Sequence, residues 1–314
     1  MDLEPLGDQP RLSETPHSRR ARFHQSWYRA KRLGITSWGS TPNGRPLGSI
    51  LPDAAAAAWA NFTTPEARDL FLVRRTQGWG VDPVRMTSYM TSSQAMLVNL
   101  IGPLGADPKW LLAVLQAVLD RPDFLDVVRW DVEFAPPARS QYLGDMTRVD
   151  AFFRVRTPTG IEGVVLELKY TDRFSSRRLD LPSNDRYWDL AHRSGLWREP
   201  ERVLSDGAIS QLLRCHALGA RTLEVDDRGK RTSLLLVSHP ADQDAGKTFE
   251  RYRAHLANPA DARHVGLDRL LDAAVSTAPS RHAESTVREL RIRYLAHDES
   301  EWHWAEHLTR SARQ

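Results

Sequence analysis

The sequence predicts an α/β (α+β) fold in which helices cover a mixed sheet. From residue 92 onward, the spacing of apolar residues gives the order helix, strand, strand, strand, helix, strand. Two strand-like runs surround a Thr-Pro-Thr-Gly turn within 148–170, which is typical of a hairpin. A short apolar run at 232–240 is typical of a strand buried on both faces. Together these three features favour a sheet whose strands run in both directions.

The residues before this core are expected to form additions to it. Residues 1–18 are polar and contain proline, so a mobile tail is expected there. The extension 19–91 is basic and helical, with helices expected over 21–34 and 53–75.

The core itself is expected over 92–240. Its first helix covers 92–104 and is expected to stop at Gly102-Pro103. The remaining core elements are a helix at 109–120, a strand at 127–135, the hairpin at 148–170, a helix at 205–220 and a strand at 232–240. No clear periodicity marks 171–203. A C-terminal helical region, 241–314, is expected to pack on the core, with helices at 245–257, 266–275 and 286–295.

Composition predicts a folded, soluble, cytoplasmic protein. Charged residues make up 26% of the 314 residues and apolar residues 41%. Cys215 is the only cysteine, so no intrachain disulfide can form and a reducing compartment is expected. The N-terminus lacks the basic-then-apolar order of a signal peptide. No apolar run approaches the roughly 18 residues that span a bilayer, so no membrane partner is expected.

Positive charge gathers near the N-terminus, although the net charge is only +3. No acidic residue lies between Glu14 and Asp53, whereas seven arginines and lysines do, interleaved with aromatic residues. Cations neutralise phosphates and release counterions, so this segment predicts contact with a polyanion. The residues expected to make that contact are Arg29, Lys31 and Arg32. The alternative is a solvated amphipathic helix whose aromatic side chains pack on the body of the protein.

An acid and an amine end the second strand of the hairpin. Side chains two residues apart on a strand share a face, so Glu167 and Lys169 point the same way. The hairpin brings Asp150 from the neighbouring strand to the same end of the sheet. Mg²⁺ prefers oxygen ligands and takes one or two protein carboxylates together with phosphate and water. A metal site with a lysine beside it is therefore predicted, and the alternative is a cross-strand ion pair.

Asp150 followed by Glu167-Leu168-Lys169 resembles the D…(D/E)-x-K signature of the PD-(D/E)xK nuclease superfamily. The restriction-endonuclease-like core of that superfamily has the order αβββαβ, which 92–240 matches. The proline that often precedes the aspartate is absent, and Val149 stands in its place. The segments FHQSWYRAKRLG, SSQAMLVNLIGPL and QLLR are similar to a bacterial restriction-endonuclease-like branch.

The resemblance implies roles for the residues of the signature. Asp150 and Glu167 would ligate Mg²⁺, for which Mn²⁺ is a substitute, and the Leu168 carbonyl would complete the shell. Lys169 would serve the attacking water. Many members carry an acid on the first core helix, where this chain has Gln94, which could face the metal or the DNA backbone instead. Glu133 could replace that acid, or it could be a glutamate on the solvent face.

Further residues are candidates because of their positions. Gln211 and Arg214 lie a turn apart on the helix after the hairpin and could face the site, with Gln211 in a catalytic role and Arg214 on phosphate. Ordinary helix-surface polarity is the alternative. Basic residues of the 171–203 segment are expected to hold the DNA backbone, namely Arg173, Arg177 and Arg178.

The expected function is a Mg²⁺-dependent DNA endonuclease that hydrolyses phosphodiester bonds in restriction, defence or DNA processing. The alternative is a catalytically inactive nucleic-acid-binding or scaffold protein of the same fold. A double-strand cut needs two active sites, so a homodimer is a reasonable assembly, although no stretch of the sequence indicates an interface.

Overall fold

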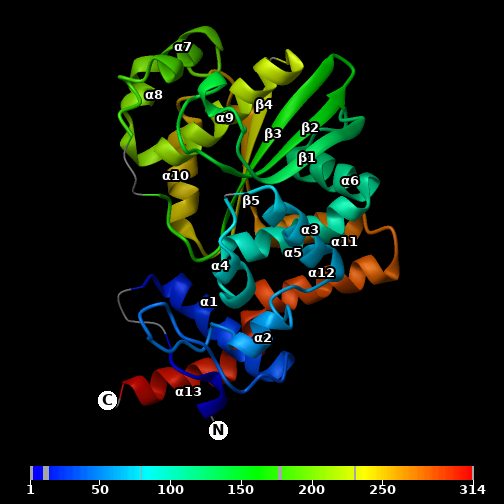
Figure 1. Ribbon diagram of the computed structural model, residues 1–314, viewed down its shortest axis with the longest axis vertical. Coiled ribbons are helices and arrows are strands. Elements are labelled where there is room, and N and C mark those ends of the chain that lie inside the picture. The colour runs from blue at the N-terminus through cyan, green and yellow to red at the C-terminus, as the bar shows by residue number, and fades with distance from the viewer. Residues whose placement is uncertain (1–2, 10–13, 79, 176–178, 230, 313–314) are drawn as a thin grey trace. The chain divides into compact units, whose positions relative to one another are not determined.

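The computed structural model describes residues 3–9, 14–78, 80–175, 179–229 and 231–312 (Figure 1). The chain divides into two compact units. The first consists of Met1–Ala106, Tyr170–Asp172 and Ala274–Gln314. The second consists of Asp107–Lys169 and Arg173–Ala273.

The first unit is helical in its described residues. Its helices are α1 (Pro16–Trp27), continued by the π-helical turn Tyr28–Arg32, α2 (Asp53–Ala57), α3 (Pro65–Thr76), α4 (Pro83–Ser88), α5 (Ser93–Ala106), α12 (Arg281–Tyr294) and α13 (Glu301–Ser311). Within the segment predicted as a tail, Leu6 is buried and α1 begins at Pro16.

The first core helix does not stop at Gly102-Pro103, and that prediction is wrong. Helix α5 continues through Pro103 to Ala106. A Cβ at Gly102 would lie 2.6 Å from the Cα of Ala67, so α5 and α3 pack almost backbone to backbone. This close packing holds the helix together beyond the proline, because tertiary contacts offset the backbone hydrogen bond that proline removes.

The second unit contains the sheet and confirms the predicted α/β class. Its elements in chain order are α6 (Pro108–Leu119), β1 (Asp126–Phe134), β2 (Val149–Thr157), β3 (Gly160–Lys169), α7 (Asp185–Arg193), α8 (Pro200–Ser205), α9 (Ser210–Asp227), β4 (Thr232–Ser238), α10 (Gln243–Arg253), β5 (Ala262–Gly266) and the start of α11 (Leu267–Ser276). The strand order is β1-β2-β3-β4-β5, antiparallel among the first three and parallel from β3 to β5. Figure 1 shows α9 beside β3 and β4 and α6 beside β1.

Three elements of this unit were not predicted. Helix α7 lies within 171–203, where the sequence shows no clear periodicity, and α8 begins in that segment and ends at Ser205. Strand β5 has only five residues, too few for alternation to stand out. Because α8 takes the residues up to Ser205, α9 begins five residues later than expected.

Helix α9 packs lengthwise along β3. A Cβ at Gly219 would lie 2.2 Å from Cγ2 of Val165, so only glycine lets the helix approach this closely. Four residues of a helix advance about 6 Å and two residues of a strand about 6.6 Å. Every fourth residue of α9 can therefore contact every second residue of β3. Residues 219, 215 and 211 of the helix therefore follow residues 165, 167 and 169 of the strand.

A buried arginine joins the other end of α9 to the sheet. Arg154 on β2 donates from Nη2 to Asp226 and from Nε to Asp227, each at 2.7 Å. Two acids at a helix C-terminus are unfavourable beside the negative end of the helix dipole. The guanidinium of Arg154 neutralises them and fixes the axial position of α9. Among the described residues, no helix combines the length and hydropathy needed to cross a membrane.

The close approach at Gly219 makes a testable prediction about stability. Gly219→Ala should lower the free energy of unfolding by about 1–3 kcal/mol, the usual cost of overpacking a core. This cost of overpacking would exceed the roughly 1 kcal/mol by which alanine stabilises a helix relative to glycine. Urea unfolding monitored by circular dichroism measures the change.

Gly246→Ala in α10 is the matched control. Its added Cβ would lie 3.6 Å from Cε1 of His264, an ordinary contact. This variant should therefore be as stable as the wild type or more stable by up to about 1 kcal/mol. Equal gains in both variants would contradict the packing of α9 on β3.

Candidate active site

Strand pairing brings Asp150 and Glu167 together. Ala151 pairs with Leu166, and one further step along the antiparallel ladder places Asp150 opposite Glu167. Oδ2 of Asp150 accepts the backbone N–H of Leu168 at 2.6 Å. At the point where β2 and β3 separate, the Asp150 carboxylate thus replaces the backbone carbonyl that would accept this N–H in a continuing β-ladder.

Glu167 and Lys169 form a buried ion pair. Nζ of Lys169 lies 2.8 Å from Oε1 of Glu167, and the two residues are 5% and 2% exposed. The lysine nitrogen also lies 4.8 Å from the ring centroid of Phe174. The predicted juxtaposition of Asp150, Glu167 and Lys169 is therefore present at one end of the sheet.

Helix α9 supplies two more groups to this cluster. Nε2 of Gln211 donates to Oε1 of Glu167 at 2.5 Å, and Oε1 of Gln211 accepts from Lys169 at 3.3 Å and from the Ser175 backbone N–H at 2.7 Å. Sγ of Cys215 donates to Oε2 of Glu167 at 3.4 Å. Both oxygens of Glu167 are thus held by donors of the protein.

Glu133 is buried rather than on a solvent face. Its neighbours Val132 and Phe134 pair with Ala151 and Val149, so Glu133 stands opposite Asp150 on β1. It is 2% exposed, and its Oε2 lies 3.3 Å from Nε of Arg148. Its backbone has φ of 47°, the left-handed region that residues other than glycine adopt at a cost of about 1–2 kcal/mol.

The close spacing of Asp150, Glu167 and Glu133 determines which groups of the cluster carry a proton. Burial and the charges of Glu167 and Glu133 raise the pKa of Asp150 well above its usual range. Burial alone would lower the pKa of Lys169, but Glu167 and Asp150 outweigh it, so that pKa is raised and the amine stays an ammonium. Burial and the nearby acids also raise the pKa of Cys215, which is a neutral thiol.

The donor set fits a hard divalent cation. Carboxylate oxygens are the ligands that Mg²⁺ prefers, and a cation would relieve the repulsion that raises the pKa of Asp150. The described residues contain no group of three His, Cys, Asp or Glu side chains already arranged around an ion position. The acids are instead held by Leu168, Lys169, Gln211 and Cys215.

Other residues predicted for the site lie in different surroundings. Arg214 is buried and donates to Oγ1 of Thr147 and to the Ser210 carbonyl, and its contact with phosphate stays a prediction. Gln94 belongs to the first unit, where it bonds the Gly80 carbonyl and the Asp82 N–H. Arg173 is exposed. Arg177 and Arg178 lie outside the described residues.

The three predicted cations of the first unit differ in exposure. Arg29 is fully buried, and its guanidinium donates to four carbonyl oxygens, those of Pro5, Ile35, Ser37 and Gly48. The prediction that it binds nucleic acid is corrected by this placement, because none of its surface reaches solvent. Lys31 is exposed, and Arg32 is exposed and paired with Glu289.

Cys215 is the contact that sequence reasoning missed. It lies four residues after Gln211, so both side chains share the face of α9 that follows β3. Arg214, three residues after Gln211, points off that face. The four-residue spacing of Gln211 and Cys215 is visible in the sequence. The sequence does not show which face of α9 packs against β3.

The raised pKa of Asp150 predicts a stability effect with a definite sign. The folded, metal-free protein binds this proton more tightly than the unfolded chain, so stability falls as pH rises above the usual aspartate pKa. Asp150→Asn removes that penalty. In EDTA at pH 8 it should raise the free energy of unfolding by about 1 kcal/mol, within the usual range for single substitutions. Adding Mg²⁺ should raise the melting temperature of the wild type but not of Asp150→Asn.

Asp126→Asn, at an exposed position of β1, is the control. It should change neither the free energy of unfolding in EDTA nor the rise in melting temperature on adding Mg²⁺. A melting temperature of Asp150→Asn at or below that of the wild type in EDTA at pH 8 would refute the like-charge repulsion described here.

Arg29 and Lys31 provide a paired test of the basic segment. Arg29→Ala should lower the free energy of unfolding by about 2–4 kcal/mol, because it leaves buried carbonyls without donors. Lys31→Ala should leave stability within about 0.5 kcal/mol of the wild type. On the polyanion contact that the charge of this segment predicts, it should also weaken binding to DNA in a salt-dependent way. Thermal unfolding and fluorescence anisotropy measure the two effects. A stable Arg29→Ala variant with weakened DNA binding would contradict the structural role of Arg29.

Comparison with known proteins gives one result that covers most of the chain. The model of the PD-(D/E)XK nuclease superfamily matches residues 12–296, a range that includes Asp150, Glu167 and Lys169. No curated protein and no solved structure matches the chain significantly. Nucleases of this superfamily generally use divalent metal ions, in agreement with the oxygen donors at this end of the sheet. The chain therefore belongs to the PD-(D/E)XK nuclease superfamily.

Proposed function

We propose that the protein is a Mg²⁺-dependent endonuclease that hydrolyses phosphodiester bonds of DNA. The observation that supports this most directly is the convergence of Asp150, Glu167 and Lys169 on adjacent strands, with Gln211 bonded to two of them. Restriction, defence or DNA processing is the biological setting proposed for this activity. A buried, neutral Cys215 suits a reducing cytoplasm.

Each residue of the cluster has a chemical role in this proposal. Asp150 and Glu167 would hold Mg²⁺, or Mn²⁺ in its place, with the Leu168 carbonyl beside them. When bound, such an ion lowers the pKa of a bound water and neutralises charge on a phosphoryl oxygen. An ammonium has three N–H donors, and the contacts of Lys169 with Glu167 and Gln211 use two. In the part of the chain that the structure describes, no hydrogen-bond acceptor takes the third, so it is available to the attacking water or to a phosphate oxygen.

Glu133 is proposed as the third acid of the site. It stands opposite Asp150, is buried, and contributes to the raised pKa of Asp150. This would give the chain an acid on β1 where other members have one on the first core helix. Gln94 would then be free for a different role, and contact with the DNA backbone is proposed for it along with Lys31, Arg32, Arg173, Arg177 and Arg178.

A second function has an observation in its favour. The oxygens of Glu167 are fully engaged by Lys169, Gln211 and Cys215, which is also what a closed structural ion-pair network would show. The corresponding alternative is a nucleic-acid-binding or scaffold protein that keeps the fold without cleaving. Cutting both strands would need two active sites, so a homodimer is proposed only together with the nuclease function.

Nicking of supercoiled plasmid DNA distinguishes the two. Lys169→Ala and the more isosteric Lys169→Met should reduce the Mg²⁺-dependent rate by about 100-fold or more, the usual effect of removing one charge-stabilising donor. DNA binding in a gel-shift assay should persist. Lys109→Ala, at an exposed lysine of α6, should nick at the wild-type rate.

Tight DNA binding by the wild type with no nicking in either Mg²⁺ or Mn²⁺ would exclude the nuclease function and favour the inactive binding protein. Circular dichroism of the Lys169 variants verifies that any lost activity does not come from unfolding.

A further inference from the structure

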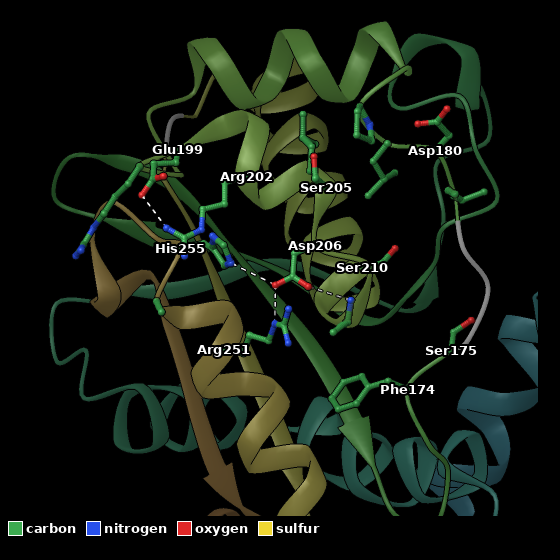
Figure 2. Close-up of a pocket in the computed structure, with 18 residues that line it drawn as sticks. Phe174, Ser175, Asp180, Glu199, Arg202, Ser205, Asp206, Ser210, Arg251 and His255 are labelled. Carbon is green, nitrogen blue, oxygen red and sulfur yellow. Dashed lines mark hydrogen bonds and ion pairs between the residues drawn. The ribbon is translucent and has the colours of Figure 1, made fainter.

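A large pocket adjoins the catalytic cluster within the second unit. Its volume is about 1270 Å³, and its wall includes Phe174, Ser175 and Ser210 (Figure 2). Phe174 also contacts Lys169, and the Ser175 N–H also bonds Gln211. Ser210 directly precedes Gln211 on α9. The pocket and the catalytic cluster thus share one wall.

The charges that line the pocket are balanced. Three arginines (Arg198, Arg202, Arg251) face three acids (Asp180, Glu199, Asp206) among the lining residues that the structure describes. Figure 2 shows Asp206 between Arg251 and His255, and its Oδ2 lies 2.6 Å from Nε of Arg251 and 3.4 Å from Nε2 of His255. A bare phosphate would find most of these cations already paired. A neutral group with both donors and acceptors suits such a wall better.

Apolar side chains form another part of the wall, so a flat ring can be accommodated. Leu179, Leu181 and Leu204 line the pocket together with the ring of Phe174. Base–aromatic stacking stabilises bound nucleotides by about 1–3 kcal/mol per base. The volume exceeds the roughly 300–1,000 Å³ of typical small-molecule sites, which leaves room for a base with its sugar.

Ser210 adds a buried polar residue to the wall of the pocket. It is 5% exposed and lines the pocket, and its Oγ has no hydrogen-bond partner among the described residues. A buried hydroxyl without a partner costs about 1–3 kcal/mol.

We propose that this pocket binds an unpaired nucleobase of the strand being cleaved, next to the scissile phosphate. The proposal rests on the proposed nuclease function and specifies its substrate. A base stacked and paired inside a duplex cannot enter a concave pocket, so the nucleotide must be unpaired or flipped out. The preferred substrate is therefore DNA with a single-stranded segment beside the cleaved bond.

Binding measured by fluorescence anisotropy tests this without requiring cleavage. The protein is the full chain carrying Lys169→Ala, with Mg²⁺ present. The probes are a labelled blunt DNA hairpin, the same hairpin with a tail of unpaired nucleotides, and a hairpin whose tail is abasic. The tailed hairpin should bind at least about 10-fold more tightly than the other two, a difference of about 1.4 kcal/mol. The abasic tail keeps the phosphates, so it separates base recognition from backbone charge.

Ala208→Trp fills the pocket from an exposed position, and Ala257→Trp adds the same side chain at an exposed position outside the lining. Added to the Lys169→Ala background, the first should abolish the preference for the tailed hairpin and the second should keep it.

Equal affinity for the normal and abasic tails, or a preference that persists in Ala208→Trp, would overturn the proposal. Cleavage by the wild type of the same hairpins is a separate measurement. Its absence would count against the nuclease function, whereas the binding comparison would still decide whether the pocket takes a base.

Discussion

The site depends on the register between α9 and β3. Because one helical turn and two strand residues advance by nearly the same distance, Gly219, Cys215 and Gln211 meet successive side chains of β3. Gly219 sets the closeness of approach, and Arg154 fixes the position of the helix along its axis through the acids at its C-terminus. A shift of one residue in either element would turn Gln211 away from Glu167.

Glu167 is the residue on which the buried charges converge. An isolated carboxylate at 2% exposure would be strongly destabilising, and an ammonium, an amide and a thiol together offset that cost. Asp150 has fewer donors, and its neighbours Glu167 and Glu133 repel its charge. The cluster therefore contains one well-compensated acid and one poorly compensated acid, an arrangement that favours the addition of a cation.

The loop after β3 connects the cluster proposed as catalytic with the pocket. Phe174 contacts Lys169 and also lines the pocket, and Ser175 bonds the same glutamine that holds Lys169 and Glu167. A ligand that moves this loop would act on the position of Lys169 directly. Recognition of a base and alignment of the catalytic amine would then be linked through neighbouring residues of one segment.

The sequence by itself determined the first four strands of the sheet, the hairpin and the meeting of Asp150 with Glu167 and Lys169, because strand alternation and a short turn are local properties. It did not determine that Arg29 is buried, since the carbonyls of Pro5, Ile35, Ser37 and Gly48 reach the guanidinium only through the folding of loops before and after it. The burial of Glu133 and the contact of Cys215 with Glu167 were also decided only by tertiary structure. Which face of a helix meets a strand depends on the packing of both elements, and no local pattern encodes it.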